Sequence, residues 1–455
     1  MKTRMNFKDE FYQKLKLLVL PIAIQNFMLA LVSATDAIML GWIDQTSLSA
    51  VSLAGQVQFF LSLFISGIAA GAGIMAAQYW GKQDAASIEK VIPIALRTNL
   101  LFSGLFTILA GFCPEMLMRI FTNDAALVAS GSQYLRAVAL SYVLCGISQV
   151  YLILLKNTGH AAVSSRISST AVVLNIILNA ILIYGLCGAP ALGIRGAAYA
   201  TVAARVVELI WAYLETKKPE RVRILWNRLF SSAGKILSED FWRYTLPVLA
   251  ASLVWGIAYV LYSVIMGHMG SDAVAANSIT SIAKSLLSCL IRGVSGGAGV
   301  LIGNLLGADE LEKAREYGGR LTHLAIAIGV VTGGLLMLIS PAIVHFAPLT
   351  DTAAEYLQYM LLFCGLNLMA QSVNTTVLDG IFCAGGDAKF DMQGNIGAMW
   401  CFSVPLGFLA AFWLKLPVMV VYCIVNLDEI VKLPAVYLHY KKYVWVRNIT
   451  RDIEE

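Results

Sequence analysis

The stretch GIAAGAG, Gly67–Gly73, returns as GVSGGAG at Gly293–Gly299 in the second half of the chain. The same register, without a gap, aligns other residues of the two halves: Leu20 with Leu246, Pro21 with Pro247, Gly41 with Gly267, Ala50 with Ala276, and Gly81 with Gly307. A match of this length indicates that one unit was duplicated. The fold must therefore be built from two similar halves.

The composition indicates that these halves lie in a lipid membrane and not in water. Of the 455 residues 58% are hydrophobic and only 13% charged, and the mean hydropathy is +0.72. One soluble core cannot bury so much apolar surface. The apolar runs are continuous and rich in Leu, Ala and Ile, which favours membrane-spanning helices over an alternating β-barrel. We expect an all-α membrane protein with about twelve spans, near residues 15–40, 47–79, 90–112, 125–155, 163–186, 193–216, 243–267, 273–305, 318–346, 353–382, 390–414 and 417–440.

Six spans per repeat is an even number, so both repeats enter the membrane in the same direction. The sequence thus predicts two parallel six-helix lobes around a central cleft, an N-lobe at 1–218 and a C-lobe at 243–455. Between them, residues 219–242 carry basic residues and apolar positions four apart, at Leu225, Leu229, Ala233 and Leu237. We interpret this segment as a cytoplasmic linker with an amphipathic helix on the membrane surface. A regulatory partner site is the alternative.

The distribution of positive charge predicts the orientation. If the N-terminus is inside, the external loops hold only Arg119, Arg195 and Lys415 of the 33 Lys and Arg residues. This bias predicts a multi-pass plasma-membrane protein with both termini in the cytoplasm and a retained first helix. The net charge of +5 then reflects attraction to lipid headgroups, and we expect membrane lipids and no nucleic acid as partners.

Several kinds of chemistry lack their sequence signals. The glycine stretches do not follow strands, and the chain has no G-x-x-x-x-G-K-[ST] loop, so G-x-x-x-G spacing for close helix packing is favoured over ATP binding. The eight cysteines and five histidines are dispersed, with no metal-ligand spacing. We therefore expect no enzyme activity, no metal and no cofactor, and an ion gradient as the energy source.

Several motifs together resemble one transporter family: the paired Leu-Pro helices, TDAIMLG at 35–41, GAPALGIRGAAYAT at 188–201, GIFCAGGDAKF at 380–390 and YKKYVWVRNIT at 440–450. They are similar to those of the multidrug and toxic compound extrusion (MATE) family over nearly the whole chain. The resemblance implies a secondary active multidrug efflux antiporter that exports small organic cations in exchange for protons or sodium ions. We expect a bacterial protein that is monomeric.

Asp36 is a carboxylate in the first apolar run. Such a group costs about 2.5 to 3.5 kcal/mol inside a membrane unless it faces water or a partner. Its distance from Pro21 predicts a place in the outer half of the bilayer. From its position alone, a carboxylate that is simply solvated at the outer interface is as well supported as a functional one. The MATE resemblance favours a functional role, because the first helix of the family carries its coupling aspartate in this motif.

Asn175 and Asn179 lie one turn apart in the fifth apolar run, and Thr201 lies in the sixth. The resemblance implies that Asn175 and Thr201 line a polar site with Asp36, whereas relatives often have an aspartate where Asn179 stands. Structural hydrogen bonding between helices is the alternative role of the two amides. Pro21 is a candidate hinge of the first helix.

The second lobe has its own candidates. Lys284 and Arg292 are spaced to share one helix face, while Asp379, Asp428 and Glu429 fall in the last apolar runs. Mutual pairing is the default expectation, with Lys432 available to Asp428, and a substrate role is the alternative. Where a sodium-using branch of the family has an acidic residue, this chain has Trp255, which disfavours sodium at that place.

We therefore expect Asp36 to bind a proton and a cationic drug in competition, because burial favours the neutral acid and water or a bound cation favours the carboxylate. Two alternatives remain. The carboxylate, amide and hydroxyl oxygens also suit sodium. A flippase for lipid-linked precursors would share the architecture but would need a more basic cleft.

Overall fold

The computed structural model describes residues 7–41, 45–224, 226, 229, 234–347 and 349–451. Within these ranges the chain is helical and contains no β-strand. The first repeat forms α1 (Phe7–Gly41), α2 (Gln45–Gly81), α3 (Ala85–Phe112), α4 (Pro114–Arg119), α5 (Ala125–Leu155), η1 (Lys156–His160), α6 (Ala161–Tyr184), η2 (Leu186–Gly188) and α7 (Ile194–Thr216). The second forms α8 (Lys235–Gly267), α9 (Ser271–Gly307), α10 (Leu311–Phe346), α11 (Asp351–Thr375), η4 (Thr376–Phe382), α12 (Ala388–Asn395), η5 (Ile396–Ser403), α13 (Val404–Phe408), η6 (Leu409–Trp413), α14 (Val418–Val425) and α15 (Asp428–Tyr440).

In the described part of the chain, ten helical runs are long and apolar enough to cross a membrane. One of them, Ala125–Tyr184, contains two predicted spans, which meet at η1, where Thr158 and Gly159 leave helical geometry. The last predicted span, 417–440, consists of the shorter helices α14 and α15. The prediction of an all-α membrane protein with about twelve helices is confirmed.

Packing divides the chain into two units. One, here called the N-terminal unit, runs from Phe27 to Leu249; the other, the C-terminal unit, begins at Ala250 and also includes α1 up to Asn26. Helices α1 and α8 therefore each begin in one unit and end in the other. The boundary between the units lies shortly after Pro21 in α1 and shortly after Pro247 in α8. The lobe boundaries 1–218 and 243–455 describe the order of the repeats along the chain and stay a prediction.

The glycine stretches of α2 and α9 allow the first parts of α8 and α1 to pack closely against them. A Cβ on Gly67 of α2 would lie 2.9 Å from Leu249 Cα, and one on Gly71 would lie 2.7 Å from Thr245 Cα, both in α8. Their counterparts Gly293 and Gly297 of α9 receive α1 in the same register: a Cβ there would lie 2.9 Å from Ala23 Cα and 2.8 Å from Val19 Cγ2. The close helix approach predicted from G-x-x-x-G is confirmed, and it obeys the sequence repeat.

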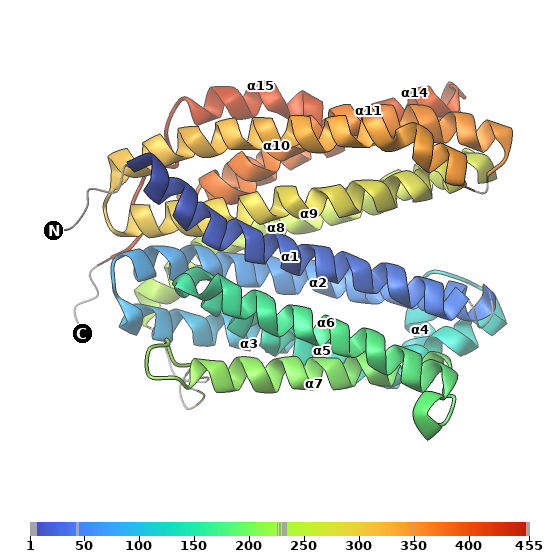
Figure 1. Ribbon diagram of the computed structural model, residues 1–455, viewed down its shortest axis with the longest axis horizontal. Coiled ribbons are helices and arrows are strands. Elements are labelled where there is room, and N and C mark those ends of the chain that lie inside the picture. The colour runs from blue at the N-terminus through green and yellow to red at the C-terminus, as the bar shows by residue number, and fades with distance from the viewer. Residues whose placement is uncertain are drawn as a thin grey trace. The chain divides into compact units, whose positions relative to one another are not determined.

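Inside each unit the long helices run side by side. In the N-terminal unit α5 packs against α2, α3 and α7, and α6 packs against α7 (Figure 1). In the C-terminal unit α9 packs against α10, α11 and η4, and α11 packs against α15. The polar residues of each unit are thus brought together by neighbouring helices that are distant in sequence.

The predicted amphipathic helix of the linker cannot be followed, because Leu225 and Ala233 lie outside the described residues. Leu237 belongs to α8 and is buried. Trp226 donates a hydrogen bond of 2.8 Å from Nε1 to the hydroxyl of Tyr151 in α5, which ties this part of the linker to the N-terminal unit.

Candidate functional site

The polar residues predicted for the first repeat come together in the N-terminal unit. Asp36 lies on α1, Asn175 and Asn179 on α6, and Thr201 on α7. Asn179 is fully buried and Asn175 is 6% exposed, whereas Asp36 and Thr201 are partly buried. Their helices end or begin near the same side of the unit, because α6 and α7 are joined by a short loop at 185–193 and Tyr184 donates to Met39 O of α1 over 2.7 Å.

Hydrogen bonds join the four side chains in a row. Asn179 Nδ2 donates to Asp36 Oδ1 at 2.5 Å and to Asn175 Oδ1 at 3.3 Å. Asn175 Nδ2 then donates to Thr201 Oγ1 at 3.3 Å, and that hydroxyl donates to Ala197 O at 3.0 Å. The asparagine side chains therefore connect the carboxylate of α1 to α7 through α6, which places the predicted site residues in one cluster.

The structure adds Tyr134 of α5 to this cluster. Its ring is buried, and it interacts electrostatically with the carboxylate of Asp36. Tyr142, two turns further along the same helix, is buried beside it. Neither tyrosine was predicted from the sequence, although their spacing of eight residues places them on one helix face.

One acceptor of the cluster has no partner. Asn179 Oδ1 is buried and receives no hydrogen bond among the described residues. An unsatisfied oxygen next to a carboxylate forms an electronegative position, which a proton on Asp36, a water or a small cation would satisfy. The cluster is thus equipped to bind positive charge.

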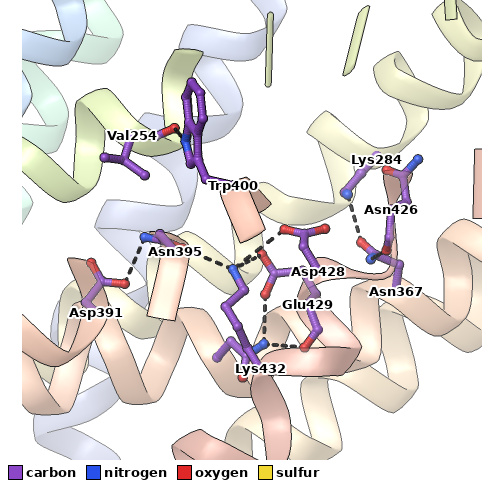
Figure 2. A network of polar contacts seen from close by, with 11 residues as sticks. Val254, Lys284, Asn367, Asp391, Asn395, Trp400, Asn426, Asp428, Glu429 and Lys432 are labelled. Carbon is purple, nitrogen blue, oxygen red and sulfur yellow. Dashed lines mark hydrogen bonds and ion pairs between the residues drawn. The ribbon is translucent and has the colours of Figure 1, made fainter. Parts of the chain in front are cut away.

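The C-terminal unit holds a second polar cluster, centred on Lys432 of α15 (Figure 2). Lys432 is 5% exposed and forms ion pairs with Glu429 at 3.1 Å and Asp428 at 3.6 Å. Asn374 of α11 donates to Glu429 Oε2 at 2.8 Å. The predicted pairing of Lys432 with Asp428 is confirmed, and both acids lie in the first turn of α15, where the helix dipole favours negative charge.

Lys284 of α9 has a different partner from the one expected. Its ammonium donates to Asn367 Oδ1 of α11 at 2.8 Å, and Asn367 Nδ2 donates to Asn426 O at 2.7 Å, in the break between α14 and α15 (Figure 2). The contact therefore ties α9 and α11 to that break. Trp255, in α8, stacks on Tyr259 with ring centroids 5.5 Å apart.

Arg292 and Asp379 are both exposed, although their sequence neighbours on α9 and η4 are buried. They interact electrostatically, but no ion pair within 4.0 Å joins them. The default expectation was that all these charges pair. Lys432 pairs with Asp428 and Glu429 on α15, whereas Arg292 and Asp379 do not form an ion pair with each other.

Two further residues of this cluster were not found from the sequence. Asp391 of α12 is 6% exposed and accepts a 3.1 Å hydrogen bond from Asn395 Nδ2 one turn later. Asn395 Oδ1 in turn accepts from Lys432 Nζ at 3.1 Å. Asp391 lies at the start of an apolar run, in AKFDMQGN, so the sequence presents it as an interfacial residue.

In the ranges that the structure describes, no group of three or more His, Cys, Asp and Glu side chains is arranged to hold a metal ion. The ligands offered to a cation are therefore single carboxylates with amide and hydroxyl oxygens.

Comparison with known proteins fits this arrangement. The probable multidrug resistance protein YoeA of Bacillus subtilis is 21% identical and covers 99% of this chain and 98% of its own. The probable multidrug resistance protein NorM of Agrobacterium fabrum is 24% identical over 84% of this chain and 83% of its own. An outward-facing multidrug resistance MATE transporter of the MOP superfamily has the same fold, with a TM-score of 0.86, 20% identity and coverage of 95% and 96%. The MatE family model matches residues 21–181 and 247–409, and the chain therefore belongs to the MATE family of transporters.

Proposed function

We propose that this transporter is a proton-coupled antiporter that exports organic cations by alternating access. Family membership supports efflux transport, and the names of YoeA and NorM support drugs as the substrates. The observation that carries the proposal is the row of hydrogen bonds that begins with the 2.5 Å contact between Asn179 and Asp36. It holds one carboxylate inside an apolar unit, where proton and cationic drug compete for it.

The charge of Asp36 provides the coupling. A proton that arrives from outside neutralises the carboxylate and weakens its attraction for a bound cation, which is released outward. Loss of the proton to the cytoplasm restores the charge and allows the next cation to bind. The hydrogen bond from Asn179 orients the carboxylate, and Asn179 is itself held by Asn175, which donates to Thr201.

Pro21 is proposed as the hinge of α1. Proline has no N–H to donate and weakens the helix around it. Pro21 lies between Val19 and Ala23, which pack against the glycines of α9, and shortly before the point where α1 passes to the N-terminal unit. A bend there would change the position of Asp36, while the preceding turns of α1 stay packed.

Sodium is the second candidate for the coupling ion. The unpartnered Asn179 Oδ1, together with Asp36, Asn175 Oδ1 and Thr201 Oγ1, supplies hard oxygen ligands. For the setting of the protein, we propose a monomer in a bacterial plasma membrane with both termini in the cytoplasm, since Lys and Arg are concentrated in the segments on that side.

The test is efflux of a fluorescent organic cation from proteoliposomes under an imposed pH gradient or an imposed sodium gradient. We expect wild-type transport to follow the pH gradient, and Asp36→Asn to lose at least tenfold of the rate, because the amide binds neither a proton nor a cation by charge. The matched control is Asp351→Asn, which changes an exposed carboxylate in the first turn of α11 and should transport like wild type.

Each other outcome has a distinct meaning. Transport that follows sodium alone would make the cluster a sodium site. Proton-driven transport that is unchanged in Asp36→Asn would exclude Asp36 as the proton carrier. No transport under either gradient would redirect the search to lipid-linked substrates.

A further inference from the structure

Asp391 of α12 is a buried carboxyl group without a cation of its own. It lies in the apolar run Ala388–Trp413 and is 6% exposed. Its hydrogen-bond partner is the neutral amide of Asn395, and among the described residues no Lys, Arg or His nitrogen lies within 4.0 Å. A buried carboxylate that lacks a paired cation is unfavourable, and taking up a proton neutralises it.

Lys432 forms ion pairs with other carboxylates and not with Asp391. Lys432 Nζ donates hydrogen bonds of 3.1 Å to Asn395 Oδ1 and Glu429 Oε1, and it forms an ion pair with Asp428 at 3.6 Å (Figure 2). One positive charge is thus already shared by two carboxylates. The amide of Asn395 lies between Lys432 and Asp391, and the charge of Lys432 acts on Asp391 from beyond ion-pair distance.

That amide has a defined orientation. An ammonium group only donates, so the side chain of Asn395 must present its oxygen to Lys432 and its NH₂ group to Asp391. Asn395 therefore donates to a carbonyl-type oxygen of Asp391 whether or not the other oxygen carries a proton. The amide is compatible with both states of the carboxyl group.

Charged groups from several other elements surround Asp391. Asp379 faces it from η4 and Glu429 from α15, both as electrostatic neighbours, and Asp428 lies next to Glu429. Arg292 of α9 acts on Asp379 from beyond ion-pair distance, and Lys284 acts on the two acids of α15. On its own helix the N-cap, Asp387, is engaged by His439 at 2.6 Å, and the Cys383 thiol lies nearby.

A second observation points to an excess of acceptors at the same place. Asn374 is 1% exposed, and its NH₂ group donates to Glu429, but its Oδ1 has no partner in the described chain. Carboxylates and an orphan amide oxygen that exceed the available donors form a site for positive charge.

From this geometry we propose that Asp391 is a second proton-binding residue of the transporter, linked by Asn395 to Lys432 and located in the C-terminal unit. Both Asp379 and Asn395 lie in or next to π-helical segments, η4 and η5, and such segments are frequent at functional sites. The inference rests on the C-terminal unit alone and holds whatever the role of Asp36 proves to be.

The test is infrared spectroscopy of the full-length protein in lipid nanodiscs at neutral pH, since a protonated carboxylic acid has a carbonyl stretch separate from the amide bands. We expect this band in wild type and expect Asp391→Asn to lose the part of its intensity that comes from Asp391. Asp36→Asn and the surface control Asp351→Asn should keep it. Thermal unfolding of each variant shows whether it is folded, and no transport assay enters the result.

A second variant supports the assignment if Asp391→Asn unfolds. Asn395→Leu removes the donor to the Asp391 carbonyl, so the band should persist and move to higher wavenumber, because a carbonyl that loses a hydrogen bond stretches at higher frequency. A band that is equally strong in wild type and folded Asp391→Asn would overturn the proposal. An unshifted band in Asn395→Leu would overturn the link through Asn395.

Discussion

Glu208 of α7 shows how a single residue contributes to the N-terminal unit. It is 1% exposed, and its carboxylate accepts hydrogen bonds of 2.9 and 3.1 Å from Arg205 Nη1 and of 2.6 Å from Ser148 Oγ of α5. The ion pair is local, but the serine makes it a contact between two helices. Its residues do not enter the candidate site, so their effect should be on stability.

We predict that Glu208→Ala destabilises the protein by about 3 kcal/mol, at the lower end for a broken buried ion pair because the Arg205 side chain is 19% exposed. The loss arises from the unpaired guanidinium that remains. Thermal unfolding in detergent measures it. The double variant Arg205→Met with Glu208→Met should recover most of the loss, and a double variant as unstable as the single one would contradict this explanation.

The carboxy-terminal segment shows how elements are joined in the C-terminal unit. Trp445 is fully buried, and its backbone passes directly over Gly385, in the turn before α12. Arg447 donates from Nε to Gly385 O at 2.8 Å and from Nη2 to Gly386 O at 2.7 Å. His439 of α15 stacks on Phe390 with ring centroids 3.8 Å apart. The two motifs 380–390 and 440–450 of the second repeat thus pack against each other.

Gly385→Ala should therefore destabilise the protein by about 1 to 3 kcal/mol, because its Cβ would lie 2.9 Å from Trp445 Cα and backbone cannot move aside as a side chain can. Trypsin cleavage near Arg447 should become faster as the segment detaches. Gly394→Ala of α12 is the matched control: nothing lies within 4 Å of the added atom, so stability should stay equal or rise. Equal stability of both variants would show that the contact is dispensable.

At the scale of the whole molecule, the first helix of each repeat begins by packing against the helices of the other repeat. Gly67 and Gly71 of α2 are covered by α8, and Gly293 and Gly297 of α9 by α1. An isolated repeat would leave one glycine stripe open and one helix start without its packing partner. The duplication therefore produces a chain whose halves depend on each other.

We predict that fragments 1–224 and 234–455 accumulate in membranes when they are expressed together and are degraded when they are expressed alone. Co-purification through a tag on one fragment measures their association. Gly71→Val in the first fragment should abolish it, since the added side chain would meet the backbone of Thr245, while Gly104→Ala, which has open space, should not. Stable accumulation of either fragment alone would contradict the dependence.

The sequence by itself determined the membrane environment, the helical fold, the duplication and the close approach at the glycine stretches, because these follow from local hydropathy, spacing and residue size. Through the family resemblance it also predicted that Asp36, Asn175 and Thr201 lie together, and the helical spacing placed Asn179 on the same face as Asn175.

Only the tertiary structure decided which helices cover the glycines and which side chains meet across helices. Tyr134 beside Asp36 and Asn395 between Asp391 and Lys432 are contacts between distant segments. A helical pattern shows which face is polar, but the partner of that face depends on how all the helices pack, and that choice is made by long-range contacts.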